Sequence, residues 1–146
     1  MKTIALRFSE NFSPDIGTIS AHQELIDELG YVWYGKLGAP ISLKVANELL
    51  SSNDPMILLI NSGKQDRYWA HIVEVSRTVP PTNEIPEYYR NIREKFKCWF
   101  KVTAFVEAPK GIMAECYVAS SNRPLGEVSK HSMSPYFIIK YEEAGK

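Results

Sequence analysis

Apolar and polar side chains alternate in three stretches of the chain. The stretches are Thr3–Phe8, Tyr68–Val75 and Cys98–Val106. Because successive side chains of a strand point to opposite faces, a period of two is typical of a strand with one buried face. The pattern therefore predicts three half-buried strands, of which the last is the clearest.

Further strands are predicted from runs without alternation. Met56–Ile60 is continuously apolar and indicates a central strand, while Tyr31–Tyr34 is short and aromatic. The turn-forming residues 61–66 lead from the apolar run into the alternating strand that follows, so we expect the two to form a hairpin. Met113–Val118 predicts a weak strand, and Tyr136–Tyr141 predicts a last one.

Cap and stop residues predict two helices. Ser20 and Gln23 fit a capping box, and the helix that they open is expected to end at Gly30. A second helix is expected to begin near Ser42 and to carry an apolar stripe as far as Leu50.

Strands and helices do not alternate regularly, which excludes a doubly wound parallel sheet. A helical turn is expected over Tyr88–Lys95 and a polar loop over Ser120–Ser134. The sequence thus predicts an α+β fold, a small, curled, mixed β-barrel with flanking helices. Because no repeat or linker divides the chain, residues 1–146 are expected to form a single domain.

The composition is that of a globular domain that needs neither disulfides nor a structural metal. The 146 residues are 45% hydrophobic, enough to bury a core. No apolar run approaches the roughly 18 residues of a membrane span, and the N-terminus lacks the pattern of a secretory signal. Two cysteines are too few for a disulfide framework, so a cytoplasmic location without membrane contact is expected.

Charge is balanced overall but unevenly distributed. The 17 basic and 17 acidic residues cancel, which excludes a general binder of the nucleic-acid backbone unless the charges are segregated. Basic residues do gather over residues 90–101 and around Arg123, Lys130 and His131. A solvated surface of mixed charge is nevertheless the commoner explanation of any one such cluster.

Residues of the usual catalytic and metal-binding types are few and scattered. His22, His71 and His131 fall on different elements, and histidines so spaced are more often surface or hydrogen-bonded core residues than metal ligands. Cys98 lies on the apolar face of its strand, where a thiol behaves as a small apolar group, and Cys116 is similar. No phosphate-binding glycine loop or metal motif is present. We therefore expect no metal, no cofactor and no enzymatic activity.

Adjacent aromatic residues recur in the predicted strands. The pairs are Trp33-Tyr34, Tyr68-Trp69 and Trp99-Phe100. Neighbours in a strand point to opposite faces, so one ring of each pair enters the core and the other faces a pocket, a loop or solvent. Because Phe100 belongs to the apolar face, Trp99 falls on the polar face with Lys101 and Thr103. Trp99 is therefore expected either to pack under a loop or to line a site.

The order of these features resembles the EVE and YTH domains of the PUA-like superfamily, from about Ser20 to Tyr141. The first matching segments are the helix leading into Gly30-Tyr31-Val32-Trp33-Tyr34-Gly35-Lys36, the apolar strand ending in Asn61-Ser62-Gly63, and the strand Tyr68–Val75. The later ones are Lys97–Val102, Phe105–Pro109, Asn122-Arg123-Pro124-Leu125 and Ser129-Lys130-His131-Ser132. The resemblance implies a PUA-like barrel that recognises a methylated adenine or cytosine, flipped into an aromatic cage.

By position, the resemblance also implies a set of site residues. The aromatic cage would be drawn from Trp33, Tyr34, Trp69 and Trp99, polar contacts from Thr18, Ser20, Asn61 and Ser62, and phosphate contacts from Arg123, Lys130 and His131. Trp33 would be one wall of the cage. The second wall would be Tyr89, Phe96 or Trp99, and the face argument favours Trp99. Stacking on such rings contributes about 1–3 kcal/mol per base.

Several functions stay open at this point. The resemblance implies a reader of modified nucleic acid that works with an effector, such as a nuclease, in a bacterial defence system. A sensor for a free nucleotide or another planar small molecule would use the same cage, and the zero net charge favours it. An ASCH-like nuclease would need an acid–base cluster, which the sequence does not offer. A protein-interaction module is a further alternative.

Overall fold

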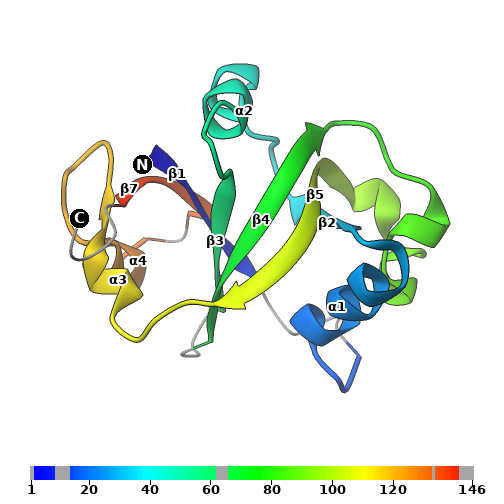
Figure 1. Cartoon of the computed structure of the whole chain (residues 1–146). Coiled ribbons are helices and arrows are strands. Elements are labelled where there is room, and N and C mark those ends of the chain that lie inside the picture. The colour runs from blue at the N-terminus through cyan, green and yellow to red at the C-terminus, as the bar shows by residue number, and fades with distance from the viewer. Residues whose placement is uncertain (1, 9–13, 62–65, 133, 142–146) are drawn as a thin grey trace.

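The computed structural model describes residues 2–8, 14–61, 66–132 and 134–141, which form one mixed sheet with helices on both faces (Figure 1). The strands are β1 (Lys2–Phe8), β2 (Val32–Leu37), β3 (Met56–Asn61), β4 (Arg67–Ser76), β5 (Phe96–Glu107), β6 (Cys116–Val118) and β7 (Tyr136–Tyr141). The helices are α1 (Thr18–Leu29), α2 (Leu43–Leu50), α3 (Ile112–Glu115) and α4 (Leu125–Lys130), and short 3-10 turns cover Thr82–Glu84, Glu87–Tyr89 and Arg93–Lys95. No helix in these ranges has both the length and the apolar character that crossing a membrane requires.

The strands are ordered β2-β5-β4-β3-β1-β7-β6 across the sheet. β1 and β3 are parallel, with Ala5 beside Leu58 and Phe8 beside Asn61, and the other neighbouring strands are antiparallel. The predicted hairpin of β3 and β4 is confirmed. The carboxyl ends of β1 and β3 therefore meet the start of β4, at Arg67, at one end of the sheet.

The predicted α+β class is confirmed, but the predicted barrel is wrong because the sheet stays open. Among the described strands, β2 pairs with β5 alone and β6 pairs with β7 alone, so the two edges of the sheet do not meet. β6 has only three residues and offers few hydrogen-bonding groups for closure.

Most predicted elements are present, with differences at their ends. α1 ends at Gly30, which adopts the left-handed conformation (φ 87°). The Ser42 hydroxyl caps α2 by accepting a hydrogen bond from the Val45 N–H at 3.1 Å. Ser20 does not cap α1, because the helix already begins at Thr18 and Ser20 lies inside its first turn.

Two segments near the C-terminus differ more from the prediction. The weak strand predicted over Met113–Val118 is the helix α3 followed by β6, and the predicted polar loop contains α4. α3 has four residues and α4 has six. Neither helix is long enough to repeat an apolar stripe, so the sequence carries no helical period there.

Three groups of buried apolar side chains stabilise the structure. The first lies between one face of the sheet and helices α1 and α2, and it includes Tyr34 and Phe100. The second lies on the opposite face, under α3 and α4, and includes Trp69. The third, which we call the Trp99 core, comprises Trp33, Ile85, Tyr89, Phe96 and Trp99. Adjacent residues of β5, such as Trp99 and Phe100, thus face different cores.

Candidate functional site

His22 of α1 is fully buried between its helix and the sheet. Its Nδ1 lies 2.7 Å from the carbonyl oxygen of Thr18, one helical turn earlier. Because a carbonyl oxygen only accepts hydrogen bonds, Nδ1 carries the proton and Nε2 is left as an acceptor. Within the described residues, Nε2 has no hydrogen-bond partner. Burial lowers the pKa of His22 to about 4, against an opposing effect of the Thr18 hydrogen bond, so the ring is neutral at pH 7.

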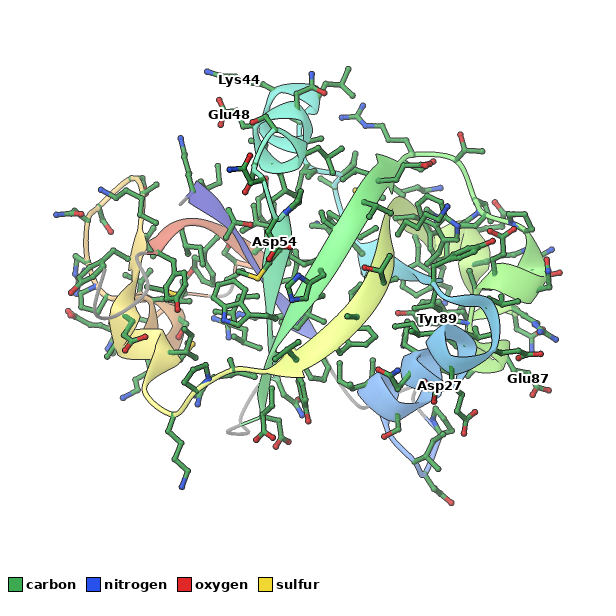
Figure 2. All side chains as sticks on the ribbon, viewed as in Figure 1. Asp27, Lys44, Glu48, Asp54, Glu87 and Tyr89 are labelled. Carbon is green, nitrogen blue, oxygen red and sulfur yellow. The ribbon has the colours of Figure 1, made fainter. Side chains whose placement is uncertain are left out.

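Four aromatic rings surround this imidazole, and together with His22 they form what we call the His22 cluster. The ring centroids of Tyr34, Tyr88, Tyr89 and Phe105 lie 5.1, 6.3, 5.0 and 6.1 Å from that of His22. They come from β2, the turn Glu87–Tyr89 and β5, and Tyr89 lies beside α1 (Figure 2). Tyr34 and Tyr89 are buried. Tyr88 and Phe105 are partly exposed and form the accessible side of the cluster.

Tyr89 connects the His22 cluster to the Trp99 core. Burial is the main reason that the pKa of Tyr89 lies well above its usual value, and the neighbouring Tyr34 and Tyr88 shift it in the same direction. Its ring centroid lies 4.5 Å from that of Phe96 and 5.9 Å from that of Trp99. A continuous row of rings thus extends from His22 to the Trp99 core.

Gly35 allows this row to approach β2 closely. A Cβ atom at this position would lie 2.6 Å from Cγ of Phe96, well inside van der Waals contact. Glycine is therefore required for the Phe96 ring to lie against the strand. The sequence predicts that the strand stops at Tyr34, but β2 runs through Gly35 to Leu37 because glycine here serves close packing.

The four side chains predicted for the aromatic cage do not come together. Trp33 and Trp99 belong to the Trp99 core. Tyr34 lies in the His22 cluster. Trp69 packs on the opposite face of the sheet, where its ring centroid is 5.0 Å from that of Tyr141. The structure therefore brings one of the four, Tyr34, to the buried histidine.

Trp99 does occupy the face opposite Phe100, but that face is covered. Apolar side chains of the segment that includes Val79, Ile85 and Ile92 pack on it, so Trp99 is fully buried under a loop. Trp33 is 6% exposed, and its Nε1 donates to Glu84 at 3.3 Å. A ligand would have to displace this segment to reach either indole.

The residues predicted for polar contacts are separated in the structure. Thr18 contacts the His22 cluster through its carbonyl oxygen. Ser20 is exposed on α1, and Asn61 is buried at the end of β3. Ser62 lies outside the described residues.

The residues predicted for phosphate contacts lie around α4. Lys130 ends this helix and lines a cleft of about 530 Å³, which Asn61 also lines. Arg123 forms an ion pair with Glu127 and lines a second cleft, of about 770 Å³. His131 is exposed directly after α4. Because α4 covers the face of the sheet opposite α1, these cations are remote from the His22 cluster.

Sequence reasoning missed most of the His22 cluster. His22 follows Thr18 by four residues, the spacing at which a helical side chain reaches a preceding carbonyl, so this contact had a signal in the sequence. Tyr89 was among the alternatives for a cage wall. Tyr88 and Phe105 come from a loop and a distant strand, and no local pattern relates them to α1.

The two cysteines lie outside this site. Both are buried, and burial raises the pKa of Cys98 and raises the pKa of Cys116 to about 12. Both thiols are therefore protonated at neutral pH and are poor nucleophiles. In the described ranges, no three His, Cys, Asp or Glu side chains are grouped as metal ligands would be.

Comparison with protein families matches residues 4–142 of the chain to the Pua-like family. No curated protein and no solved structure matches the chain. The family match runs from within β1 through β7 and agrees with the mixed sheet and flanking helices described above. The chain therefore belongs to the PUA-like family.

Proposed function

We propose that the chain is an EVE/YTH-type binding module that recognises a modified nucleobase, a methylated adenine or cytosine, at the His22 cluster. PUA-like domains commonly bind nucleic acids or modified bases. The observation that carries the proposal is the buried Nε2 of His22, which has no partner among the described residues and is enclosed by four aromatic rings.

The chemistry of the cluster suits a planar ligand with an N–H donor on its edge. A buried acceptor without a partner costs about 1–3 kcal/mol, and an amino or methylamino group of a base would remove that cost. Aromatic rings add about 1–3 kcal/mol of stacking per base. A methyl group on the base would be buried against apolar rings, whereas a charged ligand would not be solvated there.

The accessible side of the cluster defines the route of entry. Tyr88 and Phe105 are its partly exposed members, so the base would enter past their rings. Flipping a base out of a duplex costs a few kcal/mol, and the stacking and the His22 hydrogen bond would have to offset that cost. In this proposal the chain supplies recognition, and a separate effector, such as a nuclease of a bacterial defence system, acts on the marked strand.

A sensor for a free nucleotide is the second candidate. The 17 basic and 17 acidic residues cancel, and a lone nucleotide needs fewer phosphate contacts than a strand does. The same His22 cluster would hold the base in both cases.

Equilibrium binding of matched oligonucleotides, unmodified or carrying N6-methyladenine or 5-methylcytosine, tests the proposal. We expect His22→Phe, which keeps a buried ring but removes the acceptor, to weaken binding of the modified strand at least tenfold. His71→Phe is the matched control, because His71 lies on β4, bonded to Asp54 and outside the cluster. Equal affinity for modified and unmodified strands would contradict the reader, and tighter binding of the free methylated nucleosides would favour the sensor.

A further inference from the structure

The cleft of about 530 Å³ between α4 and one end of the sheet has an unusual electrostatic character for a chain with no net charge, and we call it the α4 cleft. Of the described residues that line it, three are basic, and each comes from a different element. They are Arg7 at the end of β1, Arg67 at the start of β4 and Lys130 at the end of α4. Asn61, the last residue of β3, adds an amide.

Arg7 is held rigidly in this cleft. Its Nε donates to the Ser134 carbonyl at 2.9 Å, and one terminal nitrogen, Nη2, donates to the carbonyls of Ser129 and Ser132 at 2.6 and 2.9 Å. These bonds use three of the five N–H groups of the guanidinium and leave both N–H groups of Nη1. No described residue accepts from Nη1. The guanidinium also lies over the Phe137 ring, 5.4 Å from its centroid.

The charge of Arg7 is not neutralised by its partners. All three are neutral carbonyls, and no described carboxylate forms an ion pair with Arg7. Among the described residues that line the cleft, Glu127 is the one carboxylate; it is already paired with Arg123, and that hydrogen bond and charge lower the pKa of Glu127. A partly buried, fixed cation without a counter-ion favours an anion beside it.

We propose that the α4 cleft binds phosphate groups, as a second site separate from the His22 cluster. Arg7 Nη1 and the Lys130 ammonium would contact the phosphate oxygens, with Arg67 adding charge and Asn61 a neutral donor. Guanidinium and ammonium groups are the usual partners of phosphate. The site lies on the opposite face of the sheet from the His22 cluster, because Arg7 shares the face of Ala5, which belongs to the second core.

The proposal does not depend on base recognition, and two probes distinguish the source of the phosphate. Inorganic phosphate and an unmodified single-stranded oligonucleotide are added separately to the full chain while the Arg7 Nε–H resonance is followed by NMR. A shift with inorganic phosphate or with the oligonucleotide supports the site, and the probe that acts at the lower phosphate concentration identifies the free or the strand-borne source. No shift with either probe overturns the proposal.

Variants of the other two cations, the exposed Lys130 and the partly buried Arg67, leave the hydrogen bonds of Arg7 in place. We expect the double variant Arg67→Ala/Lys130→Ala to weaken binding of the effective probe at least tenfold and to reduce the slope of log affinity against log salt by about 2 if that probe is the oligonucleotide. Lys44→Ala is the control, because this exposed lysine lies on α2, outside the cleft (Figure 2). His22→Phe should leave this binding unchanged. An equal effect of the double variant and Lys44→Ala would overturn the proposal.

Discussion

The imidazole Nδ1 of His22 lies 2.7 Å from the carbonyl oxygen of Thr18, and this contact fixes the tautomer of a fully buried histidine. The carbonyl holds the proton on Nδ1 and so leaves Nε2 as an acceptor among aromatic rings. A local contact within α1 therefore determines which ligand chemistry the His22 cluster can serve. Burial of the same imidazole also has consequences for stability.

The stability of the fold should decrease as the pH is lowered, because His22 is buried as a neutral ring. The unfolded chain takes up a proton at His22 near pH 6.5, whereas burial delays this in the folded chain to about pH 4. The unfolded state thus binds more protons within this window, and the free energy of unfolding falls by up to about 3 kcal/mol as pH drops through it. Urea denaturation between pH 7 and pH 4 measures the change. The His22→Phe variant should lose this part of the pH dependence, and an unchanged profile in that variant would contradict the assignment.

Gly35→Ala should destabilise the fold, because its Cβ would lie 2.6 Å from Cγ of Phe96. Overpacking of this kind costs roughly 1–3 kcal/mol, and denaturant unfolding would detect it. Gly126→Ala is the matched control. A Cβ atom at Gly126 would lie 3.4 Å from Cβ of Met113, which is an ordinary contact distance. Gly126 lies within α4, where alanine is preferred to glycine by about 0.5–1 kcal/mol. Equal stability of the two variants would show that Phe96 does not depend on Gly35.

Arg7→Met should lower stability by roughly 2–4 kcal/mol, because it removes three hydrogen bonds from a charged donor. The acceptors are the carbonyl of Ser129, near the end of α4, and those of Ser132 and Ser134, which follow the helix. Arg123→Met offers a comparison, because Arg123 precedes α4 and pairs with Glu127 of that helix. Arg123 and its partner Glu127 are about half exposed, so this change should cost less than about 1 kcal/mol. Thermal or urea unfolding compares them, and a similar cost for both would mean that Arg7 does not anchor α4.

Tyr88→Ala should weaken binding of a methylated oligonucleotide by about 5-fold to 150-fold, the range expected for loss of one stacking partner at 1–3 kcal/mol. Tyr88→Phe keeps the ring and should retain most of the affinity. Tyr117→Ala is a control, because Tyr117 is an exposed tyrosine of β6, outside the His22 cluster. Fluorescence polarisation measures all three. Equal affinities for the alanine variants would remove Tyr88 from the site.

The strands were predictable where burial imposes a period. Alternation located β1, β4 and β5, and a continuous apolar run located β3. The prediction that β1 is half-buried was wrong, because Thr3 to Leu6 are buried on both faces of the strand. The open sheet was not predictable, since closure depends on whether β2 and β6 pair, and no local pattern encodes that pairing. The short helices α3 and α4 were not predicted, because neither is long enough to show a helical period of apolar residues.

The candidate site was less predictable than the fold. Adjacent aromatic residues predict that rings will face both sides of the sheet, and Trp99 and Phe100 do so. Which face becomes a core depends on segments far away in sequence, and here residues around Ile85 and Ile92 cover Trp99. His22 was read as an isolated histidine because the rings that enclose it come from three other parts of the chain.

Long-range ¹H–¹⁵N NMR of the His22 imidazole tests the central claim most directly. In the free chain we expect a protonated Nδ1 and a bare Nε2. On titration with an oligonucleotide carrying N6-methyladenine or 5-methylcytosine, the Nε2 resonance should shift as it accepts a hydrogen bond, while Nδ1 stays bonded to Thr18. A methylated strand that binds and leaves Nε2 unchanged would contradict the account, because the base would then lie outside the His22 cluster.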